Sequence, residues 1–96
     1  MKHYQVTLTT ANTIYNLKAL ILAIDPLFRD SYKQLILQSD DGNSVAVHLG
    51  NAAVTTANYG IKLVAANDSV NINTGIVAGI YATSGTNAQL LDLSFF

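Results

Sequence analysis

The sequence has no cysteine and no glutamate, and charged residues account for only 11% of it. Without cysteine, the chain has neither a disulfide framework nor a thiolate metal site. All six carboxylate side chains are aspartates. Asp41 and Asp68 fall in predicted turns, where aspartate is favoured because its side chain bonds to the nearby backbone. Turn formation therefore explains these aspartates better than a pair of catalytic acids across a cleft, as in glycoside hydrolysis.

Positive charge and long apolar runs are also scarce. The five basic residues are scattered and the net charge is −1, so the chain has no basic stripe of the kind that binds nucleic acid. The longest strongly apolar run covers residues 19–24, whereas a membrane helix needs about 20 apolar residues. Residues 1–6 enter an alternating pattern directly instead of forming a signal peptide. We therefore expect neither nucleic acid nor membrane as a partner, and synthesis in the cytoplasm of the producing cell.

Few residues are candidates for catalysis or metal binding. The serines lack a G-x-S-x-G setting, and His48 falls on the polar face of a predicted strand, where we expect it to face solvent or a hydrogen-bond partner. Residues 40–44 are rich in oxygen, but a calcium loop needs about six to eight oxygen ligands and ends in a bidentate glutamate. We therefore predict no catalytic residue, no cofactor and no metal site, and a structural or binding protein rather than an enzyme.

Neutral polar residues take the place of charge. The chain has nine asparagines, nine threonines and six serines, while half of its residues are hydrophobic. Amide and hydroxyl groups suit a surface that a partner will cover, because burying them costs much less free energy than burying a charge. The alternative is a neutral β protein whose surface stays uncovered.

Short segments of alternating or continuous apolar residues dominate the chain and predict strands. They are residues 4–8, 33–39, 44–49, 52–54, 61–64, 69–73, 77–82 and 88–95. Seven or eight such strands, with turn signals every ~8–12 residues, are typical of an antiparallel β-sandwich or a small jelly-roll-like barrel. The length suits a single domain covering residues 1–96.

Two β-hairpins and one short N-terminal helix complete the prediction. Asp41-Gly42 between residues 33–39 and 44–49 predicts the first hairpin, and residues 84–87 predict a second between the last two strands. Apolar residues at 14, 17, 21 and 24 predict a helix over residues 14–24, capped by Asn12 or Thr13 and ended by Asp25-Pro26. A bent, buried strand is the alternative for residues 14–24.

Aromatic residues are the candidate contacts with partners or with other copies of the chain. Four of them lie in or beside predicted loops, namely Tyr15, Phe28, Tyr32 and Tyr59. Rings on loops of a β-sandwich can bind sugars or proteins, and the alternative is that they cap the ends of the core. Phe95 and Phe96 stand together where the last predicted strand ends, so we expect one ring to be exposed on a monomer and covered by an intersubunit contact.

Residues 33–95 resemble a pattern found in small virion proteins of tailed bacteriophages. The similarity lies in the ordered series LILQ at residues 35–38, VAVHLGNAAVTTANYGIKL at 45–63, NDSVNI at 67–72, IYA at 80–82, GTN at 85–87 and LLDL at 90–93. Residues 64–69 depart from it, because the pattern often has Gly-Glu before the serine.

The resemblance implies a small β-sandwich structural protein of the phage particle. Its expected role is capsid decoration or cement on the virion surface, as a homo-oligomer, often a trimer, with the major capsid protein as partner. The alternative is a tail, fibre or baseplate component, or a glycan-binding module for host adsorption. The resemblance places no catalytic residue on this chain.

Overall fold

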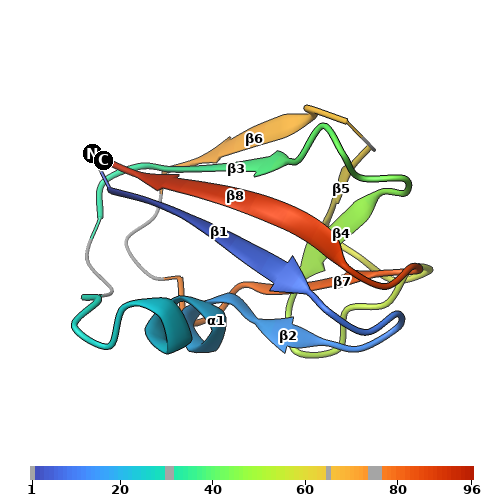
Figure 1. Cartoon of the computed structure of the whole chain (residues 1–96), viewed down its shortest axis with the longest axis horizontal. Helices are drawn as coiled ribbons and strands as arrows, with labels where there is room; N and C mark the ends of the chain where they lie inside the picture. The colour runs from blue at the N-terminus through green and yellow to red at the C-terminus, as the bar shows by residue number, and fades with distance from the viewer. Residues whose placement is uncertain (1, 30–31, 65, 74–76) are drawn as a thin grey trace.

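The protein is a two-sheet antiparallel β-sandwich with one short helix. Its structure is a computed structural model that describes residues 2–29, 32–64, 66–73 and 77–96. In these ranges the elements are β1 (Lys2–Leu8), β2 (Tyr15–Asn16), α1 (Leu17–Ile24), β3 (Leu35–Ser39), β4 (Val47–Gly50), β5 (Ile61–Leu63), β6 (Ser69–Ile72), β7 (Tyr81–Ser84) and β8 (Gln89–Phe95). One sheet has the order β1-β8-β3-β6 and the other β2-β7-β4-β5 (Figure 1). The predicted mostly β class and the sandwich are confirmed.

The core lies between the two sheets and is built from alternating residues of their strands. In β8 the even-numbered side chains are half-buried and the odd-numbered ones are buried, as the period of two requires. The fully buried side chains of the first sheet include Leu8, Leu35, Leu37, Leu91 and Leu93, and Val47, Leu49 and Leu63 face them from the second sheet. The apolar alternation that predicts the strands therefore also marks their inner faces.

The first predicted hairpin is wrong. β3 pairs with β6 and β8, whereas β4 pairs with β5 and β7, so the two strands lie in opposite sheets. The Asn43 N–H donates to the Asp40 carbonyl (3.1 Å) and closes a turn. Gly42, however, does not have the positive φ that a two-residue hairpin of the expected type demands. β3 and β4 each have an apolar face. Because the chain crosses from one sheet to the other, both faces are buried in the same core, one from each sheet.

The second predicted hairpin is wrong for the same reason. β7 lies beside β4 and β8 lies beside β1 and β3, so residues 85–88 cross between the sheets. β7 also begins later than expected, at Tyr81, because the Ile80 N–H donates to the Val77 carbonyl (3.0 Å) and closes a turn before it. Residues 52–54 form a turn instead of the expected strand.

The helix prediction is confirmed over residues 17–24, and only the two residues of β2 before it are extended. Asn16 caps α1 in place of Asn12 or Thr13, since its side-chain oxygen accepts the Ala19 N–H at 3.0 Å. Asp25 ends the helix and its carboxylate accepts the Tyr4 hydroxyl at 2.7 Å, which ties α1 to β1. This hydrogen bond lowers the pKa of Asp25, because it stabilises the ionised carboxylate.

Four aromatic rings close the core next to α1. Phe95 lies 5.1 Å from both Phe28 and Tyr32 and 5.9 Å from Tyr4, measured between ring centroids. Tyr4 and Phe28 also meet edge to face at 5.7 Å. These distances fall in the range where aromatic pairs attract each other beyond their buried area. The cluster joins β1, β8 and the two loop segments that flank residues 30–31.

Candidate functional site

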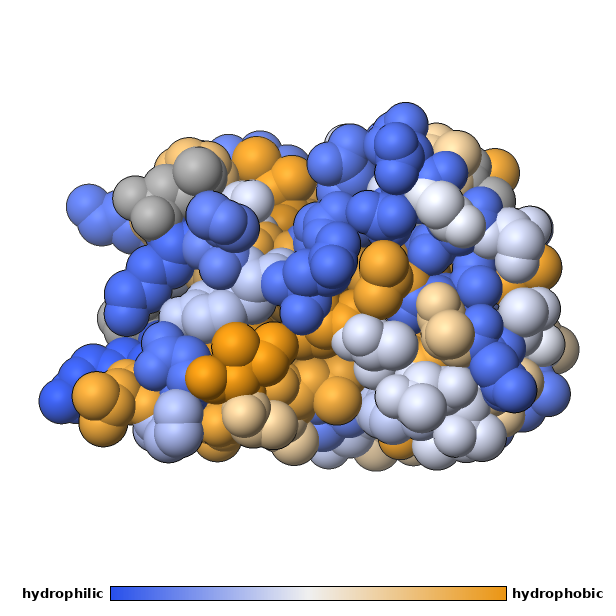
Figure 2. Space-filling view, viewed as in Figure 1, coloured by the Kyte–Doolittle hydropathy of each residue, from blue (hydrophilic) through white to orange (hydrophobic). Residues whose placement is uncertain are grey.

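The outer side of α1 is an apolar surface. Leu17 and Ile21 are buried, yet Ala19, Ala23 and Ile24 are exposed on the same helix. Leu27, which follows the helix, is 85% exposed. We call the four exposed residues Ala19, Ala23, Ile24 and Leu27 the α1 surface, and the region of α1 is largely hydrophobic in Figure 2. A helix that is apolar around most of its circumference is usually buried on all sides, so this surface is unusual for a protein in contact with water.

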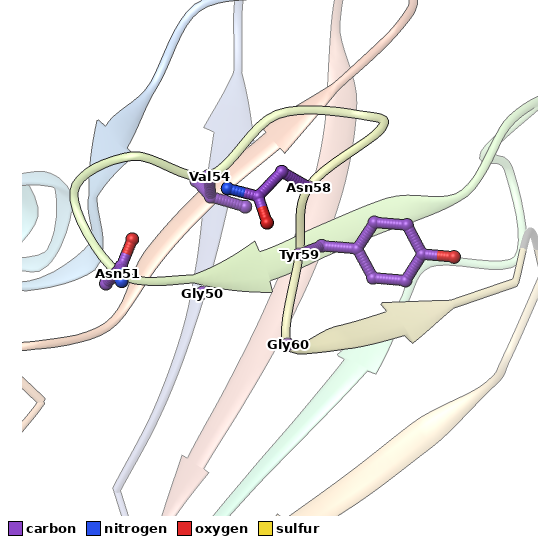
Figure 3. A pocket seen from close by; sticks show the side chains of 6 residues that line it. All are labelled: Gly50, Asn51, Val54, Asn58, Tyr59 and Gly60. Carbon is purple, nitrogen blue, oxygen red and sulfur yellow. The ribbon is translucent and has the colours of Figure 1, made fainter.

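A second feature is a small pocket beside the end of β4. Its volume is about 240 Å³, and Gly50, Asn51, Val54, Asn58, Tyr59 and Gly60 line it (Figure 3). We call it the asparagine pocket. The Gly60 N–H donates to the Leu49 carbonyl at 2.8 Å, which brings the two glycines together. A Cβ on Gly50 would lie 3.2 Å from the Val54 side chain, so a larger residue there would crowd the pocket.

The loop over the asparagine pocket is held by its own side chains. Asn51 accepts the Ala53 N–H at 2.9 Å, and Thr55 accepts the Asn58 N–H at 2.9 Å. The Thr55 N–H donates to the Asn58 carbonyl at 2.8 Å. Between these turns the Val54 side chain is buried and anchors the loop. The pocket is therefore pre-formed on a braced loop.

Tyr59 and His48 pack against each other beside this pocket, with their rings tilted by 55°. Their ring centroids are 4.7 Å apart, and Tyr59 is 43% exposed whereas His48 is only 8% exposed. Figure 3 shows the Tyr59 ring pointing away from the pocket and along β4. Tyr59 covers much of His48, and the Nδ1 of His48 has no hydrogen-bond partner in the described part of the chain.

Burial and a neighbouring cation both act on His48. Burial lowers its pKa below the ordinary 6.5, and Lys62 lowers it further, because it lies directly opposite on β5 and repels a second positive charge. The neutral imidazole is therefore favoured in the folded protein.

We expect the free energy of unfolding to decrease as the pH falls below about 6.5. The unfolded chain protonates His48 at its ordinary pKa of 6.5, before the folded protein does, so protons stabilise the unfolded state. The stabilisation by neutral His48 is complete above that pH. Urea unfolding at about pH 7.5 and about pH 5 measures the effect. His48→Gln is the control, and an equal pH dependence in both proteins would contradict the prediction.

The predicted aromatic contacts differ in how far they are exposed. Phe28, Tyr32 and Phe95 are buried. The prediction that Phe28 and Tyr32 are exposed on loops is therefore wrong, and the alternative, in which they cap the core, holds for both. Tyr59 and Phe96 are exposed, and Phe95 points inward beside Phe96, as the expectation of one exposed ring requires. Tyr15 is half-buried and its hydroxyl accepts the Thr10 N–H at 2.9 Å.

The sequence reasoning missed the α1 surface and the asparagine pocket. The signal for the first was present, since the run LKALILAI holds a single charged residue. The pocket depends on the backbone hydrogen bond between Leu49 and Gly60. These residues are eleven positions apart, and no short sequence pattern predicts that they meet.

Among the described residues, no group of three or more His, Asp or Glu side chains could hold a metal ion. No helix in the same ranges has the length and hydrophobicity to cross a membrane. No family model matches the chain, and neither a curated protein nor a solved structure matches it.

Proposed function

We propose that the chain is a non-enzymatic structural protein of a virus particle, a capsid decoration or cement protein. In this role it associates with copies of itself, as a trimer, and with major capsid subunits. The observation that carries the proposal is the α1 surface. The likeness of residues 33–95 to small phage virion proteins and the two-sheet sandwich support it.

The α1 surface has the chemistry of a surface that a neighbour covers. Ile24 is 56% exposed and Leu27 is more exposed still, and the exposed Ala19 and Ala23 of α1 are small enough to let another backbone approach closely. Removing such side chains from water contributes about 25 cal/mol per Å² of apolar area. Over the whole chain, the Asn, Thr and Ser residues outnumber the charged ones and cost less free energy to bury than charges would.

The proposed mechanism is the multiplication of weak contacts by symmetry. One small apolar surface gives a modest affinity, but a symmetric oligomer engages several equivalent surfaces of a shell at once. Once one subunit is bound, the others bind at a high effective concentration. The oligomer therefore holds neighbouring capsid subunits together without a catalytic step.

We expect the double variant Ile24→Lys, Leu27→Lys to be monomeric under conditions where the wild-type chain is an oligomer. Burying two ammonium groups in the contact costs more free energy than the two apolar side chains contribute, so the dissociation constant rises at least about 100-fold. A lysine at the end of α1 also suits the helix dipole, so the fold is preserved. Size-exclusion chromatography with light scattering measures the mass of the particle.

Val64→Lys is the matched control, because Val64 is exposed to the same 56% as Ile24 but follows β5, well away from α1 in Figure 1. It leaves the oligomer intact. A wild-type chain that stays monomeric at high concentration would contradict the proposal. Mass spectrometry of purified virus particles from producing cells provides the second test, since the chain must be present in them in many copies.

A further inference from the structure

We infer that the asparagine pocket and the adjoining Tyr59 ring form a binding site for a neutral saccharide. The site is separate from the α1 surface, so the inference does not rest on the proposed function. A decoration protein and a tail component would each be able to use it at the virion surface.

The size and charge of the pocket select the class of ligand. Its volume of about 240 Å³ lies below the ~300–1,000 Å³ of pockets that hold drug-sized molecules, so it suits one ring at a time. None of its six lining residues carries a charge. An ionic ligand would find no counter-charge in it, and a large apolar ligand would find only the Tyr59 ring, because Val54 is buried. A neutral, polar, single-ring group remains.

Two side-chain amides supply the polar contacts. The carboxamide of Asn58 makes no side-chain hydrogen bond in the described part of the chain, and Asn51 uses only its oxygen, on the Ala53 N–H. Asn58 therefore offers both donors and an acceptor, and Asn51 offers its donors. Sugar hydroxyls both donate and accept, so they can pair with these groups. Figure 3 shows the two carboxamides on different sides of the pocket, with Gly50 at the end of β4 and Gly60 directly before β5.

The rigidity of the site lowers the cost of binding. The turns at Asn51 and Thr55 hold the loop, and buried Val54 anchors it. Ordering a flexible side chain or loop on binding costs about 0.5–1.5 kcal/mol per side chain, which a pre-formed site avoids. This matters for saccharides, because each of their hydrogen bonds replaces one with water and gains little net free energy.

The Tyr59 ring supplies the apolar part of the contact. His48 packs against it, so the ring is fixed in place while 43% of the residue stays exposed. A held, amphipathic ring is a suitable surface for the C–H face of a sugar. Because the ring points away from the pocket along β4, it extends the site to a second position (Figure 3). The geometry thus fits a ligand of at least two sugar residues, one in the pocket and one over the ring.

The test is a titration of the isotope-labelled full chain with neutral disaccharides of glucose, galactose and N-acetylglucosamine, followed by amide chemical shifts. We expect at least one disaccharide to shift the signals of residues 50–60 and to leave those of α1 unchanged. Tyr59→Ala and Asn58→Ala each weaken this binding at least 10-fold. Asn71→Ala, an exposed asparagine on β6, binds as the wild type does.

Several outcomes would overturn the inference. One is the absence of shifts in residues 50–60 with every disaccharide at concentrations up to about 20 mM, well above the affinity of a weak site. Others are equal binding by Tyr59→Ala and the wild type, or shifts confined to another face. Binding of extended peptides alone along β5, an edge strand of its sheet, would also overturn it. Ile24→Lys, Leu27→Lys keeps the sugar binding, so failure of this site and failure of the proposed function are distinguishable.

Discussion

Replacing Phe95 by alanine is expected to lower the free energy of unfolding by about 3–5 kcal/mol, the range for deleting a buried aromatic ring. The Phe95 ring is 6% exposed and touches Tyr4, Phe28 and Tyr32. Its loss leaves a cavity and removes three aromatic contacts at once. Urea unfolding followed by circular dichroism measures the change, and the midpoint should fall while the slope stays constant.

Phe96→Ala is the control for this prediction. Its side chain is 51% exposed, and its backbone keeps its hydrogen bonds to Gln34 whatever the side chain. We expect a change within about 0.5 kcal/mol, as for an ordinary surface substitution. Equal losses for the two phenylalanines would contradict the inward placement of Phe95. Phe95→Leu, which leaves a smaller cavity, keeps the comparison measurable if Phe95→Ala fails to fold.

Asn43→Ala is expected to lower the free energy of unfolding by about 2–4 kcal/mol. The buried Asn43 carboxamide donates to the Leu90 carbonyl at 2.7 Å and accepts the Leu90 N–H at 2.8 Å, so it acts as a strand partner for β8. Each hydrogen bond contributes about 0.5–1.5 kcal/mol, and a backbone group left without a partner costs about 1–3 kcal/mol. Thermal and urea unfolding provide the measurement.

A second side-chain amide, that of Gln89, also makes a hydrogen bond in this region. Gln89 accepts the Ser44 N–H at 2.9 Å, and together with Asn43 it holds the crossing between β3 and β4 to the start of β8. Asn71→Ala is the control, since Asn71 is exposed on β6, and we expect a change within about 0.5 kcal/mol. If both asparagine variants unfold at the same urea concentration, the Asn43 hydrogen bonds to Leu90 do not stabilise the crossing.

Most strand positions follow from the sequence because burial acts on each residue separately. The alternation around Val6 and Leu8 marks an inner face whichever strands are neighbours. Residues 17–24 form a helix as predicted, although the cap is Asn16, since residues 15–16 pair with β7 first. Boundaries of this kind depend on contacts that are distant in sequence.

Strand partners do not follow from local patterns. Asp41-Gly42 occurs in hairpin turns, but it also occurs where a chain crosses from one sheet to the other. The choice is made by Asn43 and Gln89, whose partners lie more than 40 residues away along the chain. Aromatic residues show the same limit, because Tyr32 and Tyr59 look alike beside predicted loops but are buried and exposed, respectively.

The sequence by itself therefore predicted a mostly β chain of short strands with one short helix, little charge and no cysteine chemistry, and it left the choice between a sandwich and a small barrel open. These properties depend on residue type and on periods of two and 3.6 along the chain. Only the tertiary structure decided which strands pair, which rings are buried, and that Asn51 and Asn58 line one pocket beside Tyr59, which packs against His48. It also decided that α1 contributes Leu17 and Ile21 to the core while Ala19, Ala23 and Ile24 stay exposed, because one helix can turn only part of its apolar circumference toward the sheets.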